Sequence, residues 1–489
     1  MNPARRLSRS TAVQVALRQS LWSGMGSTWR LLPRSFRGRL AFMAPVADRL
    51  VAPSTRMLFE NRPIALADWK PIFAAADFAA GPIVLVNSAL TAGGAERQVV
   101  NTLLALDRRG LRCGLLCLRL HDEPLYDFFV PALAGFSGFA RNVMPLKRAE
   151  PILSEMIGAD AAARLLAATA WLPRYIQDQV ICFCADFASL KPCVVHAWQD
   201  GTGIVAGFAA RLVGVPRIVV SSRNLAPTNF AYFQSYMEYA YREIASCQSI
   251  KMVNNSAAGA RSYVDWLGLP HDRFIVKRNG VDVTAMKRAP ADAVAALRER
   301  LKIPAGAKVV GSIFRFYPEK QPLLWVETAA RIVGLDRSCH FVVFGEGPLH
   351  GKAVALARRL ACADRLHFPG NIENTGLGLS LLDVFLLTSK FEGTPNVVLE
   401  ASALGVPVVT TDAGGAAEAV EENVTGYVAD ADPERLAQQV LAILRDDAWA
   451  ARVKTEGPKF ITGRFGLDRM LDETLALYGL PATHYEGAR

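Results

Sequence analysis

Residues 383–418 read DVFLLTSKFEGTPNVVLEASALGVPVVTTDAGGAAE. This pattern predicts a strand, a loop, a helix and a second strand, in that order, at 383–387, 389–395, 396–404 and 406–410. Gly405 suits the end of the helix, and Gly414 with Gly415 suits a turn. The order is typical of a parallel βαβ unit, in which ligands bind beyond the carboxyl ends of the strands.

The loop before the predicted helix carries candidate binding residues. Thr394 can cap the helix and Pro395 suits its first position, so we expect the free amides around Asn396 to attract a phosphate. Glu392 precedes these amides, and Glu400 shares a helical face with Asn396 about one turn deeper. Two carboxylates beside an anion site suit the hydroxyls of a nucleotide sugar. The alternative is a capped helix with two solvated glutamates.

Glu392 and Glu400 form an E-x7-E pair, which a GG-x-x-E motif follows at 414–418. The stretch resembles the retaining GT-B glycosyltransferases of family 4, the glycosyl transferases group 1. The flanking residues that also match are Ser389, Gly393, Pro395, Asn396, Gly405 and Pro407. The resemblance implies an α/β fold with two Rossmann-like domains facing a cleft. It also implies that the first glutamate lies near the donor sugar and that the second holds the ribose.

A second motif follows the predicted strand KVVGSIF at 308–314. Arg315 and Lys320 come next in RFYPEK, and two cations at a strand end suit a diphosphate. Their R-x4-K spacing matches the phosphate pair of the family, although Phe314 stands where a glycine often precedes the arginine. No Asp-x-Asp clamp lies beside either motif, so the resemblance implies that these cations replace a metal. The alternative is solvated surface charge.

The first domain offers three weaker candidates. Gly94 lies in a GGAE turn between a strand at 81–90 and a helix, which also resembles the family, where this loop faces the cleft. His196 is expected to end a strand and to contact the donor sugar or a leaving hydroxyl. Arg223 follows the strand VVSS and suits an anionic acceptor. The alternatives are a ligand-free helix start, a structural histidine and a surface ion pair.

These motifs predict four segments, and the resemblance covers roughly 81–480. They are a basic amphipathic N-terminal extension (1–80), a Rossmann-like acceptor domain (81–290), a Rossmann-like nucleotide-sugar domain (291–462) and a C-terminal helix that crosses back to the first domain (463–489). The sequence NGVD at 279–282 matches the family's mark for the end of the first domain.

The net charge of the chain is +10, and its distribution is uneven. Residues 1–56 hold ten arginines, no lysine and one acid, Asp48. The rest of the chain is nearly neutral, which argues against nucleic acid as a partner. Arginines interleaved with Trp and Leu predict that residues 1–60 bind an anionic membrane surface. The alternatives are a basic tail that packs on the body and a transit-like segment.

The eight cysteines are scattered and form no paired CxxC set, which predicts buried, reduced thiols in a cytosolic protein. We find neither a secretory signal nor an uninterrupted run of 18 apolar residues. The expected location is therefore cytoplasmic, peripheral at the inner face of the cytoplasmic membrane.

The sequence thus predicts a retaining glycosyltransferase that moves a sugar from a UDP- or GDP-linked donor to a hydroxyl of a lipid-linked saccharide, in surface or extracellular polysaccharide assembly. The candidate catalytic residues are Glu392, Arg315, Lys320 and His196; the donor-binding residues are Gly94, Arg315, Lys320, Thr394, Pro395, Asn396 and Glu400; and Arg223 is the acceptor candidate. No metal ligand and no cofactor besides the donor is expected.

Three alternatives stay open. The first is a non-catalytic nucleotide-sugar-binding subunit of a membrane polysaccharide machine, which four intact motif residues disfavour. The second is a sugar-phosphate synthase of the same fold. The third is a GT-B epimerase or phosphorylase, and the phosphorylase would require a pyridoxal-binding lysine that the sequence does not identify.

Overall fold

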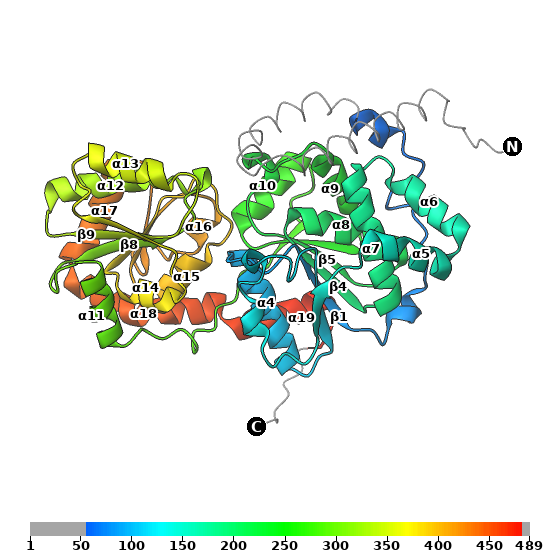
Figure 1. Ribbon diagram of the computed structural model, residues 1–489, viewed down its shortest axis with the longest axis horizontal. Helices are drawn as coiled ribbons and strands as arrows, with labels where there is room; N and C mark the ends of the chain where they lie inside the picture. Colours follow the sequence, from blue (N-terminus) through cyan, green and yellow to red (C-terminus); the bar gives the residue numbers. More distant parts are fainter. Residues whose placement is uncertain (1–54, 482–489) are drawn as a thin grey trace.

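The computed structural model describes residues 55–481, which form two α/β domains lying side by side (Figure 1). Each domain contains one parallel sheet with helices on both faces. Near-continuous apolar runs make up the strands because both faces of a parallel sheet are buried. The predicted pair of Rossmann-like domains is confirmed.

The first sheet has seven strands in the order β3-β2-β1-β4-β5-β6-β7, all parallel. Its strands are β1 (Ile83–Asn87), β2 (Cys113–Cys117), β3 (Phe139–Asn142), β4 (Val194–Trp198), β5 (Ile218–Ser222), β6 (Ile250–Asn254) and β7 (Phe274–Val276). The strand order reverses between β1 and β4. In open α/β sheets, ligands bind beside such a switch point.

Helices cover this sheet unequally. The cover consists of α4 (Gly94–Arg108), α5 (Leu146–Ile157), α6 (Ala159–Thr169), α7 (Arg174–Leu190), α8 (Asp200–Val213), α9 (Tyr236–Ser246) and α10 (Ala257–Leu267). Helices α7 to α10 pack on one face, with α5 and α6 beside α7. The opposite face is covered by α4 and by the last helix of the described chain, α19 (Leu467–Tyr478).

The second sheet has six parallel strands in the order β10-β9-β8-β11-β12-β13. Its strands are β8 (Val309–Ile313), β9 (His340–Phe344), β10 (Leu366–Gly370), β11 (Val384–Leu387), β12 (Val408–Thr411) and β13 (Gly426–Ala429). Its helices are α11 (Ala291–Arg300), α12 (Pro322–Leu335), α13 (His350–Arg359), α14 (Thr375–Ser380), α15 (Asn396–Ala403), α16 (Gly415–Glu418), α17 (Pro433–Arg445) and α18 (Asp447–Phe465). The order reverses between β8 and β11, so the two sequence motifs meet at this switch point.

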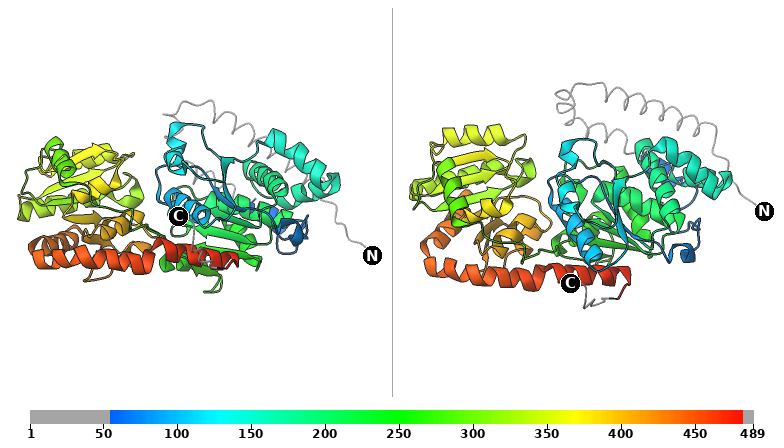
Figure 2. Two further views of the ribbon diagram at one scale, coloured as in Figure 1. Left: turned by 90° about the horizontal axis from the view of Figure 1, so that it is seen from below. Right: turned by 60° about the horizontal axis from the view of Figure 1, so that its bottom comes forward.

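The chain returns to the first domain at its end. Helix α18 runs along the second domain, and α19 continues onto the first (Figure 2). At the junction, the Val281 amide donates to the Phe465 carbonyl over 2.8 Å, and the Leu467 amide donates to the Val281 carbonyl over 3.1 Å. Leu471, Leu475 and Tyr478 of α19 are buried in the core of the first domain.

Residues 55–80 pack on the first domain. The Trp69 indole donates to the Leu212 carbonyl over 2.9 Å, and Glu243 accepts from Arg62 and from the Leu66 amide. The membrane prediction for residues 1–60 depends mainly on residues 1–54, which lie outside the described residues. Among residues 55–481, no helix is both long and apolar enough to cross a membrane. All eight cysteines are free thiols and seven of them are buried, as the sequence predicts.

Candidate active site

Helix α15 begins at Asn396, and Pro395 is its N-cap with no side-chain capping bond. The expectations that Thr394 caps the helix and that Pro395 occupies its first position are therefore wrong. The Thr394 hydroxyl instead donates to the Asn255 carbonyl of the first domain over 2.7 Å. A contact between the domains has replaced the local cap, and the first amides of α15 keep no side-chain acceptor.

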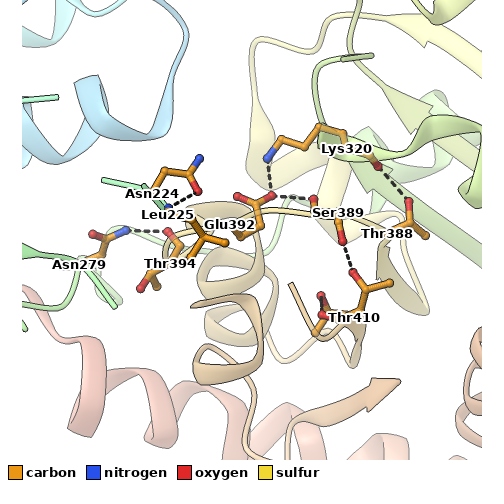
Figure 3. Close-up of polar contacts among 10 residues, drawn as sticks. Asn224, Leu225, Asn279, Lys320, Thr388, Ser389, Glu392, Thr394 and Thr410 are labelled. Carbon is orange, nitrogen blue, oxygen red and sulfur yellow. Dashed lines mark hydrogen bonds and ion pairs between the residues drawn. The ribbon is translucent and has the colours of Figure 1, made fainter. Parts of the chain in front are cut away.

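Glu392 lies in the loop after β11 and is 6% exposed. It forms an ion pair with Lys320, and the Ser389 hydroxyl donates to the same carboxylate oxygen over 2.7 Å (Figure 3). Its backbone is fixed as well, because the Glu392 amide donates to the Ala413 carbonyl over 2.9 Å. Glu392 is thus a buried, paired carboxylate, and the alternative of a solvated glutamate is contradicted.

Arg315 and Lys320 both follow β8, but their side chains have different surroundings. Lys320 closes a short 3-10 turn (Pro318–Lys320) and reaches Glu392. Arg315 is exposed, with its guanidinium carbon 5.2 Å from the centre of the Tyr317 ring. Within residues 55–481, Arg315 forms no ion pair, so its charge is available to an anion at the switch point.

Glu400 lies in the second turn of α15 and is 3% exposed. Its Oε1 atom is 2.8 Å from Nη1 of Arg97, which belongs to α4 of the first domain. Burial raises the pKa of Glu400, and the Arg97 charge opposes this shift. The second oxygen, Oε2, is buried and has no hydrogen-bond partner among the described residues. Glu400 therefore keeps one acceptor atom for a ligand hydroxyl.

The sequence reasoning missed Arg97. The residue lies three positions after Gly94 in the first turn of α4, so it shares a helical face with the predicted Gly-Gly turn. The same spacing rule that links Glu400 to Asn396 would have identified it.

Asn396 and Gly94, the donor-binding candidates of the two domains, are in direct contact. The Asn396 amide group donates to the Gly94 carbonyl over 2.7 Å, and its oxygen accepts from Asn279 over 2.7 Å and from Gln98 over 3.2 Å. Asn279 also donates to the Thr394 carbonyl over 3.0 Å. A Cβ atom at Gly94 would lie 3.1 Å from the Asn396 amide nitrogen, so a larger residue would crowd this close approach.

Glu418, the last residue of the GG-x-x-E motif, is another contact between the domains. Its carboxylate accepts from the amides of Ala257 and Ala258, over 3.0 and 2.8 Å, at the start of α10. A carboxylate at a helix N-terminus is stabilised by the free amides and the helix dipole. The motif therefore ties the second domain to the first.

His196 is not where the sequence led us to expect it. It lies in the middle of β4, is 0% exposed, and contacts Tyr478 Oη through Nδ1 and Ser221 Oγ through Nε2, both at 2.7 Å. Burial lowers the pKa of His196 well below its usual value, with the charges of Lys277 and Arg223 adding to the effect. Both ring nitrogens are occupied within the core, so the structure contradicts a contact with the donor sugar.

Arg223 follows β5, as predicted, at the carboxyl edge of the first sheet. It donates to Asn279 and has no carboxylate partner among residues 55–481, so it is not part of a surface ion pair. The structure thus joins Arg223 to the Asn279–Asn396 contact between the domains.

Within residues 55–481, no group of three or more His, Cys, Asp or Glu side chains is arranged to hold a metal ion. The carboxyl ends of β8 and β11 carry Lys320, exposed Arg315, Glu392 and the first amides of α15, and Glu400 lies in the second turn of that helix. Carboxylates can accept from sugar hydroxyls, while cations and amides can bind phosphate oxygens.

Two family models match the chain, one in each domain. Glycosyltransferase Family 4 matches residues 92–285, and Glycosyl transferases group 1 matches residues 294–460. The first match contains Gly94 and Arg223, whereas the second contains Arg315, Lys320, Glu392 and Glu400.

Two relatives come from polysaccharide and lipid-linked saccharide biosynthesis. The chain is 28% identical over 368 residues to the Vi polysaccharide biosynthesis protein VipC/TviE of Salmonella typhi, covering 72% of this chain and 62% of that protein. It is 27% identical to the UDP-Gal:alpha-D-GlcNAc-diphosphoundecaprenol alpha-1,3-galactosyltransferase of Escherichia coli, covering 58% of this chain and 74% of that enzyme. The chain therefore spans only part of the length of these relatives.

HepE of Anabaena, crystallised with UDP and glucose, has a similar fold. The TM-score is 0.64 at 18% identity, over 82% of this chain and 99% of that one. The fold, the E-x7-E and R-x4-K motifs and both family models agree. The chain belongs to the GT-B glycosyltransferases, with a family 4 domain followed by a glycosyl transferases group 1 domain.

Proposed function

We propose that the protein is a retaining glycosyltransferase that moves a sugar from a nucleotide donor to a hydroxyl of a saccharide acceptor. Residues 81–290 would bind the acceptor, and residues 291–462 would bind the donor. The observation that carries the proposal is the burial and ion pairing of both glutamates of the E-x7-E pair. Glu392 and Glu400 are both buried where the domains meet, and each is paired with a cation, Lys320 or Arg97.

The residues of the second domain would share the work of bond cleavage. Arg315, Lys320 and the first amides of α15 would stabilise the charge that develops on the departing diphosphate, a form of electrostatic stabilisation. Lys320 already contacts Glu392, so one cation would link the leaving group to the carboxylate that orients the donor sugar. Glu400 would hold the ribose through its unpartnered Oε2 atom.

The donor sugar is proposed to be linked to UDP, with GDP as the alternative. HepE, which shares the fold, was crystallised with UDP and glucose, and the name of the E. coli relative specifies a UDP-sugar. No metal is assigned to the reaction, because the family resemblance gives the role of a metal to Arg315 and Lys320.

The acceptor is proposed to be a lipid-linked saccharide in polysaccharide assembly. The name of the E. coli relative supports a lipid-linked acceptor, and the name of the Salmonella relative supports polysaccharide assembly. We further propose that the protein works at the inner face of the cytoplasmic membrane, held there by residues 1–60. Binding to anionic liposomes, compared between the full chain and a variant lacking residues 1–60, tests this attachment, and unchanged binding of the shortened chain would reject it.

A donor screen tests the activity. The purified protein is incubated with UDP-, GDP- and ADP-sugars, with and without a crude lipid-linked acceptor, and the release of free nucleotide is measured. Release from one donor, stimulated by the lipid, supports the proposal, and the anomeric configuration of the product tests retention. Tight nucleotide-sugar binding without release under any condition would favour a non-catalytic binding subunit.

A further inference from the structure

Three side chains meet at the carboxyl edge of the first sheet. Trp198 is the last residue of β4, Arg223 follows β5, and Lys277 follows β7. The guanidinium carbon of Arg223 lies 4.5 Å from the centre of the Trp198 ring, and the Lys277 ammonium lies 5.6 Å from the same ring. Both cations therefore gather on one indole, at the edge where parallel sheets bind ligands.

Two of these three side chains, Arg223 and Trp198, have hydrogen-bond donors without an acceptor. Nε and Nη1 of Arg223 and Nε1 of Trp198 are buried and have no acceptor within residues 55–481. Lys277 is 2% exposed, and no carboxylate of the described chain lies within ion-pair distance of Lys277 or Arg223. Burial lowers the pKa of Lys277 to about 7 and that of Arg223 to about 9. The cluster thus holds buried positive charge with no directly paired carboxylate among the described residues; the acid that acts on Lys277, Glu473, is itself paired with Arg469.

A purely structural role explains this cluster poorly. Elsewhere in the same domain, well-buried charges have partners: Glu243 pairs with Arg62 and Asp186 pairs with Arg141, each over 2.6 Å. An uncompensated buried charge destabilises a fold, so it is retained where something outside the fold needs it.

The cluster adjoins the E-x7-E loop. Arg223 donates through Nη2 to Asn279, whose side chain in turn donates to Asn396 over 2.7 Å. Gly393, the neighbour of Glu392, packs directly on the Arg223 carbonyl, where a Cβ atom would clash. A ligand held by this cluster would therefore lie beside the loop that carries Glu392.

We propose that Trp198, Arg223 and Lys277 form a binding site for an oxyanion carried by the sugar substrate. The proposal rests on the proposed glycosyltransferase function and adds that one substrate is acidic. The planar guanidinium can bind two oxygens of a carboxylate or phosphate, Lys277 contributes a point charge, and the indole N–H gives a further donor. The oxyanion belongs either to the donor sugar, as a hexuronate carboxylate, or to the acceptor, as a carboxylate or phosphate.

Calorimetry on the full chain tests the site in three steps. UDP alone measures the nucleotide site. The affinity for UDP-glucuronate, compared with that for UDP-glucose, shows whether the site binds an oxyanion on the donor sugar. The affinities for glucuronate and for glucose 1-phosphate are each compared with that for glucose, in the presence of saturating UDP. They show whether the site binds an oxyanion on the acceptor. The variants are Arg223→Gln and Lys277→Met, with Arg242→Gln on the exposed side of α9 as the control that removes a surface charge.

We expect at least one acidic compound to bind about tenfold or more tightly than its neutral match, because charge-assisted hydrogen bonds contribute at least that much. Either variant at the site should abolish this preference, whereas Arg242→Gln should keep it and UDP binding should be unchanged in all three. Circular dichroism checks the folding of each variant, and Lys277→Met alone decides the result if Arg223→Gln does not fold.

Two results would overturn the site. The first is normal UDP binding with no preference for any acidic compound, and the second is a preference that persists in Lys277→Met. If the wild-type protein does not bind UDP, the proposed function itself is contradicted. Failure of the oxyanion site and failure of the proposed function are therefore distinguishable.

Discussion

The Glu400 carboxylate of the second domain lies 2.8 Å from the Arg97 guanidinium of the first. Glu400 is almost completely buried, whereas the Arg97 side chain is 32% exposed. Because burial raises the pKa of Glu400 and Arg97 opposes the shift, the first domain helps to keep this carboxylate ionised. An ionised carboxylate accepts hydrogen bonds only, which is what ribose hydroxyls require.

Arg97→Gln should therefore change the pH dependence of activity. Without the guanidinium, the pKa of Glu400 rises further, and more of the carboxylate is protonated at acidic pH. We expect the acidic limb of kcat/KM against pH to move to higher pH, with a smaller loss of activity at alkaline pH. Arg108→Gln, an exposed position on α4, is the matched control. Parallel pH profiles for Arg97→Gln and the wild type would exclude this role.

Under the proposed function, Lys320→Ala should lower donor turnover by about a hundredfold or more, because it would remove a cation that stabilises the departing diphosphate. The variant should stay folded, although Glu392 loses its ion-pair partner. Nucleotide release measures turnover, and a thermal melt checks folding. Lys352→Ala, at an exposed position on α13, should behave as the wild type. Normal turnover by Lys320→Ala would remove Lys320 from the mechanism.

Tyr478→Phe tests the role of His196. The substitution removes the hydroxyl that lies 2.7 Å from His196 Nδ1 in the core of the first domain. A structural histidine predicts a loss of about 1 kcal/mol in the free energy of unfolding, with kcat/KM unchanged within about twofold. A large fall in kcat at normal stability would instead support a catalytic role for His196.

Lys277→Met should stabilise the protein at neutral and acidic pH. Burial lowers the pKa of Lys277 from 10.5 to about 7, and the charged groups that act on it are Arg223, Glu473 and Arg469. The Lys277 charge in turn lowers the pKa of the buried His196. Between the two pKa values of Lys277 the unfolded chain binds more protons than the folded one, so stability rises with pH there and the penalty is largest below pH 7.

For Lys277→Met we expect a gain of roughly 1–3 kcal/mol at pH 6 that shrinks toward pH 10. Differential scanning calorimetry across this pH range measures the gain, with Lys251→Met at an exposed position on β6 as the control. A destabilised Lys277→Met variant at pH 6 would mean that the ammonium has a structural partner.

The local parts of the site were predictable from the sequence. The E-x7-E and R-x4-K motifs each lie within one strand–loop–helix unit, and spacing alone places their residues at a strand end or on a helix face. For this reason Glu392, Glu400 and Lys320 were all identified, along with the two parallel-sheet domains. The same local rules failed at Thr394, because a carbonyl of the other domain competes for its hydroxyl.

Contacts between distant segments could not be predicted. Arg97 and Glu400 are separated by about 300 residues and meet only because the two domains pack in one particular way. The burial of His196 depends on α19, which arrives from the far end of the chain. The burial of the Lys277 ammonium could not be predicted, because a lysine after a strand ordinarily reaches solvent. Only the packing around Trp198 encloses it.

The chain passes between the domains twice, once between β7 and α11 and once between α18 and α19, and the two passages touch at Val281. Two covalent links that meet at one place act as a pivot. A junction of this kind favours rotation of the domains about Val281 over sliding or separation. The mutual approach of Arg97 and Glu400 is therefore set by a few backbone torsions around 280–282 and 465–467. If the proposed reaction requires the domains to open and close, substitutions at this pivot would alter kcat without touching a substrate.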